Sequence, residues 1–363
     1  MKKLEYTVSF NTPAFLGNAE QQAQWRTPPF KALIRQWWRI ATAHSVAYEI
    51  AALRTKEASL FGSASDTDGS SSERSRVVVR LSSWKPGGLD QWQSGGRVFH
   101  REVGNGGREI GTDLYLGYGP LTFVRGTAFS TVRGTGVQRT AIGAKIDVSH
   151  FILGVPDEHC AALEKVVQLI ASFGTIGSRS RNGWGSLDMR PIGREPGLST
   201  LNRNNLEKLN VGRSLADCLK LEWPHAIGTD AKGPLVWKTK MHAPNWHLII
   251  DELARIKIQF RTQFAFPSSG SSVSKRHVLA YPITNHSVNG WGGQARLGNQ
   301  LRFKVSTHQS GGLEGIIFHL PCKMPDELVN KVSPTDQQFI RNNELSIWQS
   351  VHNVLDKEAV RLQ

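Results

Sequence analysis

The sequence predicts an α+β fold, and its first half follows the order β-α-β-β-α-β. A strand is indicated at residues 4–10, where apolar and polar side chains alternate. A helix is indicated from residue 27 to about residue 54, with Thr27 as its N-cap and two prolines in the first turn, and an amphipathic helix spans residues 158–173. This order is that of the ferredoxin-like fold, which common RNA-binding domains share.

The other strands of this pattern are shorter apolar runs at residues 76–84, 146–155 and 186–189. Between the first two, residues 85–143 are crowded with Gly and Arg, which predicts an irregular insertion with short strands. A polar, low-complexity stretch at residues 63–75 predicts a loop.

After a polar linker at residues 191–205, the second half predicts a degraded copy of the same fold. Helices are predicted at 206–219, 246–262 and 335–361, and short strands at 276–284, 300–307 and 315–320. The predicted domains are therefore residues 1–192, which contain the Gly/Arg-rich insertion, and residues 193–363, which end in a helix.

The chain is basic along its whole length. Its 363 residues include 44 Lys and Arg against 30 Asp and Glu, a formal charge of +14 that both halves share. A basic excess spread over folded domains indicates a long polyanion, above all nucleic acid, as the partner. The alternative is a basic protein that is merely soluble.

The cysteines and the N-terminus limit the class of protein. The 3 cysteines are far apart, with no Cys-x-x-Cys and no Cys/His cluster at zinc spacing, so neither a metal nor another cofactor is predicted. Sparse cysteine fits a reducing compartment. The N-terminus does not resemble a signal peptide, and no apolar window reaches the roughly 18 residues of a membrane span. We therefore expect a cytoplasmic protein.

The first predicted helix has two distinct faces at about 100° per residue. One face is apolar and is expected in the core: Phe30, Leu33, Ile34, Trp37 and Ala41. The adjoining face is basic with one aromatic side chain: Lys31, Arg35, Trp38 and Arg39, preceded by Arg26. Such a face either lies in solvent or binds phosphates. In the second case Trp38 stacks on a base or a partner, and the helix N-terminus near Thr27 adds positive charge.

A loop rich in Gly, Arg and Ser joins the second helix to the last strand of the first half. The residues expected to bind RNA there are Gly177, Ser178, Arg179, Ser180, Arg181, Asn182, Gly183 and Trp184. Glycine lets backbone amides approach another chain closely, arginine supplies charge for phosphate oxygens, and Trp184 packs inward or stacks on a base. The Gly-Lys of phosphate-binding loops is absent, and the loop holds no nucleophile or base. The pattern predicts a clamp for a single strand; the alternative is a turn with solvated arginines.

The insertion adds basic residues to this set. Arg125, Arg133 and Arg139 are spaced among glycines in what we predict to be a β-hairpin. Such a finger either follows an RNA backbone, braces a neighbouring subunit, or is only a solvated loop.

Several segments resemble the RAMP superfamily, the repeat-associated proteins of CRISPR systems. The glycine signature of that family is met by Gly177, then SRSRN, then Gly183-Trp-Gly. Further segments resemble subunit one of type III-B (Cmr) effector complexes: FNTPAFLG at 10–17, Arg26, FKALIRQWWR at 30–39, LFG at 60–62, YLGYG at 115–119 and, loosely, ARLGNQLR at 295–302. The resemblance covers residues 4–190 well. It departs at Thr27-Pro-Pro, where the family has a more glycine-containing turn.

The resemblance implies a protein of two ferredoxin-like RAMP domains that holds the 3′ portion of a guide RNA beside other RAMP subunits. Such proteins help to position guide and target RNA in antiviral defence. Target cleavage in these complexes is assigned to the repeated backbone subunit, so the resemblance implies that this chain is not an enzyme.

Other functions stay open on the residues. Some RAMP relatives process guide RNA without a metal through a histidine near the first helix, for which His44 is the candidate. Such cleavage needs a second group near the 2′-hydroxyl, which the sequence does not single out. Backbone-type RAMP nucleases use a loop aspartate, and Asp66, Asp68 and Asp113 lie in expected loops. A scaffold that binds only proteins through Trp-rich surfaces is the remaining alternative.

Overall fold

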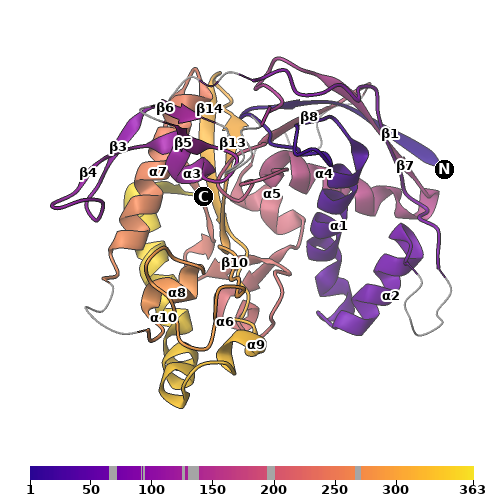
Figure 1. Ribbon diagram of the computed structural model, residues 1–363. Helices are drawn as coiled ribbons and strands as arrows, with labels where there is room; N and C mark the ends of the chain where they lie inside the picture. The colour runs from indigo at the N-terminus through magenta and orange to yellow at the C-terminus, as the bar shows by residue number, and fades with distance from the viewer. Residues whose placement is uncertain are drawn as a thin grey trace.

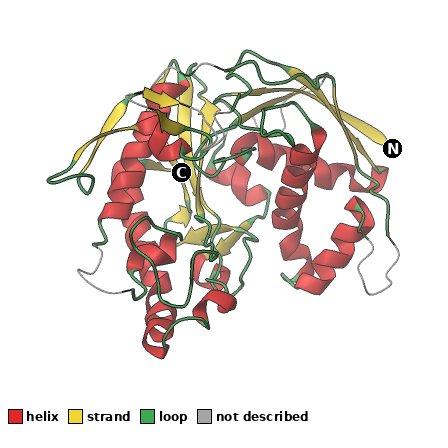
Figure 2. Cartoon of the chain, viewed as in Figure 1, coloured by secondary structure: helices red, strands yellow, loops and turns green. Residues whose placement is uncertain are grey.

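The computed structural model describes residues 1–64, 72–90, 92, 95–124, 127–129, 139–193, 201–265 and 271–363. It confirms the predicted α+β class (Figures 1 and 2). Two antiparallel four-stranded sheets form the frame, and helices and smaller sheets surround them.

The first sheet has the strand order β2-β7-β1-β8. Its strands are β1 (Lys2–Phe10), β2 (Val78–Leu81), β7 (Ser149–Val155) and β8 (Leu187–Pro191). The two helices of the β-α-β-β-α-β unit are α1 (Thr27–Ala43) and α4 (Cys160–Phe173). The rings of Phe30 on α1 and Phe151 on β7 meet at 5.6 Å, so α1 covers a face of the sheet. The predicted β-α-β-β-α-β unit is confirmed.

The prediction of one long first helix is wrong. α1 ends at Ala43, a 3-10 turn follows at His44–Val46, and Ala47 and Tyr48 have φ of 49° and 63°. A separate helix, α2 (Ile50–Phe61), then lies beside α1 (Figure 1). The apolar spacing continues across the break, so periodicity alone does not reveal it.

The insertion holds more regular structure than predicted. A hairpin of β3 (Arg97–His100) and β4 (Arg108–Gly111) leads into α3 (Thr112–Gly117). A second hairpin pairs β5 (Thr122–Val124) with β6 (Thr127–Phe129). α3 has six residues, too few for a periodic pattern, and it packs against a helix of the second half.

The second sheet repeats the topology of the first, with the order β13-β14-β12-β15. In chain order its unit comprises β12 (Val236–Ala243), α7 (Trp246–Thr262), β13 (Leu301–Thr307), β14 (Leu313–His319), α10 (Pro334–Glu358) and β15 (Val360–Arg361). The predicted second copy is therefore present. Both of its long helices and the strands at 300–307 and 315–320 are confirmed.

Elsewhere in the second half the predictions fail. The strand β12 was not predicted, and the helix expected at 206–219 is divided into α5 (Arg203–Lys208), β9 (Gly212–Ser214) and α6 (Leu215–Cys218). A small sheet pairs β9 with β10 (Ile227–Asp230), and β10 with β11 (Gly233–Pro234). This small sheet precedes the second unit, and a domain division after residue 192 stays a prediction.

The strand expected at 276–284 begins as a short helix, α8 (Lys275–Leu279). Ser274 and His277 form a capping box, with Ser274 N donating to His277 Nδ1 at 2.9 Å. This local start signal decides the conformation there against the apolar alternation. One further short helix, α9 (Asp326–Val329), precedes α10.

β13 joins the second sheet to the end of the glycine-rich loop. Phe303 N donates to Arg181 O at 3.0 Å, and Val305 N donates to Ser186 Oγ at 2.8 Å. The buried ammonium of Lys304 donates to three carbonyls of the first unit at 3.2, 2.7 and 2.8 Å: Ile170, Ala171 and Leu187. The segment 181–187 is therefore held between the two sheets.

Candidate nucleic-acid interface

The basic face of α1 packs against α2 through one buried carboxylate. Glu57 is 5% exposed, accepts from Arg35 Nε at 2.7 Å, and accepts from Arg39 Nε and Nη2 at 2.5 and 2.7 Å. Burial alone would raise the pKa of Glu57, but the hydrogen bonds from Arg39 and Arg35 bring it below its ordinary value. These two arginines thus have an internal partner.

Trp38 is buried rather than presented to a base. It is 4% exposed, and its ring meets that of Phe61 on α2 at 5.6 Å. The expectation that Trp38 stacks on RNA or on a partner is therefore wrong for this structure.

The start of α1 also differs from the expectation. Arg26, not Thr27, is the N-cap, and two prolines follow in the first turn, so two of its residues carry no N–H. The helix start therefore offers a phosphate fewer amides than a first turn without proline would. Arg26 and Lys31 are half-buried beside it.

The glycine-rich loop has a buried base and an exposed tip. Gly183 and Gly185 are buried, whereas residues 177–179 and Arg181 are exposed. A methyl group at Gly185 would lie 1.9 Å from Ile176 O, and one at Gly177 would lie 2.8 Å from Phe15 O. With φ of 62° and 96°, these glycines let the loop approach the protein's own backbone, not RNA as expected.

Trp184 and Asn182 support the loop from inside. Trp184 has 0% exposure and packs among aromatic rings at 5.4 to 5.6 Å: Phe15, Trp92 and Trp246. Asn182 donates to Leu116 O at 2.8 Å and accepts from Lys257 Nζ at 2.8 Å. Trp184 therefore offers no stacking face, and the amide of Asn182 is already used. Gly183 is buried with them, while Ser178 and the half-buried Ser180 stay at the tip.

Arg179 and Arg181 project from this tip, and within the described ranges neither has an ion pair with a carboxylate. Arg179 has a φ of 58°, and a methyl group at Gly119 would lie 3.2 Å from its Nη2. Partial burial lowers the pKa of Arg179. Arg181 Nη1 lies 3.4 Å from Asn299 O and fills the space beside Gly298, where a methyl group would be 1.7 Å away.

The tip is thus flanked by two segments that are distant in sequence, 115–119 beside Arg179 and 295–302 beside Arg181. Both segments were singled out in the sequence. Burial, together with the positive charge of Arg181, lowers the pKa of Arg302 to about 9. Two neighbouring guanidinium groups that repel each other favour a bound anion.

Two cations of α7 were missed in the sequence. Lys257, only 7% exposed, lies close to both Arg179 and Arg261, and the spacing of four residues places Lys257 and Arg261 on one helix face. This spacing was the available signal. The spacing alone does not distinguish these two residues from the basic side chains of a solvent-exposed helix face, because their neighbours in space come from other segments.

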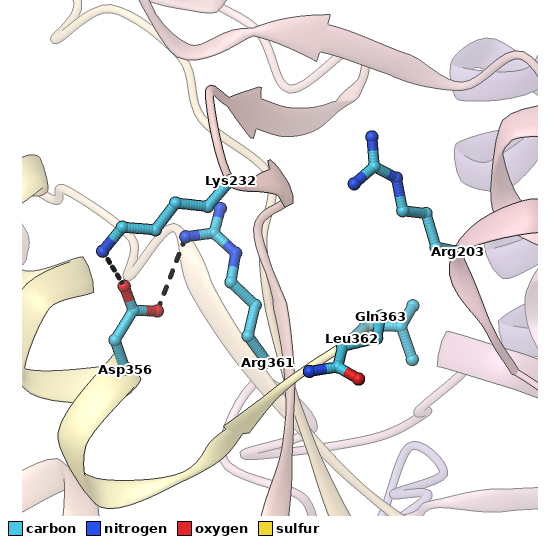
Figure 3. A pocket seen from close by; sticks show the side chains of 6 residues that line it. All are labelled: Arg203, Lys232, Asp356, Arg361, Leu362 and Gln363. Carbon is cyan, nitrogen blue, oxygen red and sulfur yellow. Dashed lines mark hydrogen bonds and ion pairs between the residues drawn. The ribbon is translucent and has the colours of Figure 1, made fainter.

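A second group of basic side chains lines a pocket of about 360 Å³ near the C-terminus (Figure 3). Lys232 and Arg361 share Asp356 at 2.7 and 3.4 Å, and Arg203 pairs with Glu207 at 2.7 Å. Each cation of this pocket has a carboxylate partner. The pocket therefore lacks the excess positive charge of the loop tip.

The basic residues of the insertion are only partly placed. The hairpin β5–β6 ends at Phe129, and Arg125 and Arg133 lie outside the described residues, so a hairpin that carries the three arginines stays a prediction. Arg139 is half-buried, close to the bridge between Leu89 and Ala141.

The candidate catalytic residues are dispersed. His44 is exposed at the end of α1, with Nδ1 3.3 Å from Asn210 Nδ2. Asp113 is buried, and its Oδ2 accepts from Trp92 Nε1 at 3.1 Å and from Gly95 N at 2.7 Å, which is a supporting role. Asp66 and Asp68 lie outside the described residues.

Within the described part of the chain, no three His, Cys, Asp or Glu side chains are placed to hold a metal ion. None of the helices described is both long and apolar enough to cross a membrane.

Comparison with solved structures gives distant similarities. Cmr1 from Pyrococcus furiosus, in its apo form, is 18% identical over 94% of this chain and 97% of that chain, with a TM-score of 0.46. A chain of the type III-B Cmr-beta complex bound to cognate target RNA is 10% identical over 97% of this chain and 100% of that chain, with a TM-score of 0.46. A chain of a type IV-B CRISPR complex is 13% identical over 55% of this chain and 95% of that chain, with a TM-score of 0.31. A search of curated proteins finds no match.

The family model is more informative. The model of the RAMP superfamily matches residues 7–188, which span the first sheet, its two helices, the insertion and the glycine-rich loop. This match covers half of the sequence, and the chain therefore belongs to the RAMP superfamily.

Proposed function

We propose that this chain is a non-catalytic, RNA-binding subunit of a CRISPR type III-B effector complex in antiviral defence. In this proposal it binds and positions the 3′ portion of the guide RNA and the target RNA, beside other RAMP subunits. Family membership supports a CRISPR role. The segments at 10–17 and 30–39 support subunit one of the type III-B complex in particular.

The observation that carries the proposal is the exposed loop tip with Arg179 and Arg181. Elsewhere, Arg35 and Arg39 share a carboxylate, and the cations of the C-terminal pocket are paired. The tip differs because within the described ranges its guanidinium groups have no acidic partner. A phosphodiester backbone supplies the missing negative charge. The packed base holds the tip in place, which limits the entropy lost on binding.

Replacing both Arg179 and Arg181 by alanine tests the proposal. We expect weaker binding to single-stranded RNA of any sequence, and a salt slope reduced by about one for each lost phosphate contact. Fluorescence anisotropy at several salt concentrations measures both. Arg341→Ala, which removes an exposed arginine of α10, is the matched control and should bind like wild type. Equal affinities of double variant and wild type at low and moderate salt would show that the loop does not bind RNA.

Metal-independent processing of guide RNA is the alternative function. The exposed position of His44 near Asn210 is compatible with it. Incubating the purified chain with repeat RNA in a chelator decides between the two. A specific product that disappears in His44→Ala would overturn the non-catalytic assignment. A protein-only scaffold would instead co-purify with sister subunits and give no RNA crosslinks.

A further inference from the structure

Behind the loop tip, the Lys257 ammonium lies near two guanidinium groups, those of Arg179 and Arg261. Arg179 belongs to the loop, and Lys257 and Arg261 belong to α7. Both arginines repel the Lys257 ammonium, which donates to Asn182 Oδ1 at 2.8 Å and lies 5.6 Å from the centroid of the Tyr115 ring. Arg261 lies beside the hydroxyl of Tyr115.

The described side chains supply no carboxylate to these three cations. Glu102, which also influences Tyr115, is already bound by Arg276, with 2.7 Å between Glu102 Oε2 and Arg276 Nη1. Residues 114–146, which include Tyr115 and the β5–β6 hairpin, contain no Asp or Glu at all. The segment 114–146 therefore supplies no carboxylate to the cluster.

A buried ammonium next to two guanidinium groups is unfavourable without an anion. Burial, followed by the charges of Arg261 and Arg179, places the pKa of Lys257 well below its ordinary value. An anion among the three would favour the charged form of Lys257 and accept several charge-assisted hydrogen bonds. A phosphate group accepts from several cationic donors at once, and the proposed function brings phosphate to this surface.

An exposed aromatic residue lies next to the cluster. Tyr118 is 51% exposed, immediately before Gly119, against which the Arg179 guanidinium lies. Bases of single-stranded RNA stack on such side chains beside a backbone contact. The segment YLGYG at 115–119 thus supplies an aromatic ring behind the cations and another at the surface.

We propose that Arg179, Lys257 and Arg261 together hold one phosphate group of bound RNA, and that Tyr118 stacks on the adjacent base. The inference rests on the proposed RNA-binding function and adds a nucleotide site that both halves of the chain build. The phosphate is either an internal phosphodiester or a terminal phosphomonoester, and the RNA used in the test distinguishes these sources.

Binding of the full chain to single-stranded RNA with a 3′-hydroxyl or a 3′-phosphate, measured by anisotropy, tests the site. Lys257→Met and Arg261→Gln should each weaken binding by about 5- to 100-fold. Equal losses for both RNAs assign an internal phosphate, and a larger loss for the phosphorylated RNA assigns a terminal one. Tyr118→Ala should weaken binding without changing the salt slope, and Tyr118→Trp should restore it.

A double-variant cycle separates a shared phosphate from independent effects. Lys257→Met combined with Arg179→Gln should cost less than the product of the two losses, because both side chains hold one group. Lys257→Met combined with Arg181→Gln, on the other flank of the tip, is the matched control and should be multiplicative.

Thermal unfolding distinguishes a binding role from a structural one. Without RNA, Lys257→Met should melt at the wild-type temperature or above it, because substitution removes a repelled buried charge. A lower melting temperature with unchanged RNA affinity in both Lys257→Met and Arg261→Gln overturns the phosphate site. If the Arg179/Arg181 double variant still loses RNA under those conditions, the proposed function stands and only this site falls.

Discussion

At the scale of single residues, the partner of each cation decides whether that cation is available to bind RNA. Arg35 and Arg39 keep 37% and 45% of their side-chain surface exposed, yet one buried carboxylate serves both. The loop arginines are similar in chemistry but have no such partner within the described ranges. Exposure alone therefore does not identify an RNA contact.

Glu57→Gln tests the role of the buried carboxylate that Arg35 and Arg39 share. We expect a loss of about 1–2 kcal/mol in the free energy of unfolding, because a buried charged acceptor is lost while both arginines stay partly solvated. Urea denaturation measures it, and Glu49→Gln, an exposed carboxylate at the start of α2, is the matched control. If α1 also contacts RNA, the freed arginines will steepen the salt dependence of binding. An unchanged unfolding free energy would contradict the role assigned to Glu57.

The sequence identified some site residues and not others for a physical reason. Arg179 and Arg181 stand out because they lie among glycines in one short segment. Lys257 gains its meaning only from tertiary neighbours, Asn182 and Tyr115, which are far from it in sequence. The same limit applies to Trp38, since nothing local shows that α2 covers its ring.

At the scale of elements, the glycine-rich loop depends on contacts within the protein. Gly185 and Gly193 both have positive φ, of 62° and 71°, but only Gly185 faces backbone atoms at close range. Substitution at Gly193 therefore measures the cost of a positive φ alone. Substitution at Gly185 measures that cost together with the steric overlap.

Gly193→Ala should cost about 1–2 kcal/mol in the free energy of unfolding, the usual penalty of a left-handed backbone with a Cβ. Gly185→Ala should cost several kcal/mol, because the new methyl group would overlap Ile176 O. Chemical denaturation of the two variants makes the comparison. Similar losses at both positions would mean that the loop base is not closely packed.

Long helices with a clear apolar periodicity were predictable, and short elements were not. The sequence located α7 and α10 because seventeen and twenty-five residues carry a clear helical pattern. It missed α3 and the break after α1, where local backbone conformation decides. It also missed β12, whose second half is polar because it lies partly exposed.

At the scale of the whole molecule, a buried pair of histidines links stability to pH. His319 Nδ1 on β14 lies 3.0 Å from His352 Nε2 on α10. Burial lowers the pKa of His352 to about 3 and that of His319 well below its ordinary value. The folded protein therefore disfavours protonation of both rings relative to the unfolded chain.

The free energy of unfolding should therefore fall as the pH drops below about 6.5, by up to about 1.4 kcal/mol per pH unit for each histidine. Glu344 acts in the opposite direction, because burial raises its pKa to about 7. The test therefore compares the free energy of unfolding of wild type with that of the double variant His319→Gln, His352→Gln. Urea denaturation measures both from pH 7 to pH 5. Parallel profiles of the two proteins would contradict the assignment.

The position of residues 181–187 between the two sheets has a practical consequence for mapping experiments. A fragment that stops after residue 192 would expose Trp184 and leave the carbonyls bound by Lys304 without a donor. A fragment that starts later would lack Arg179. Either half alone should fail to bind RNA. Deletion mapping would then assign RNA binding to each half separately, although it depends on the contact between the two halves.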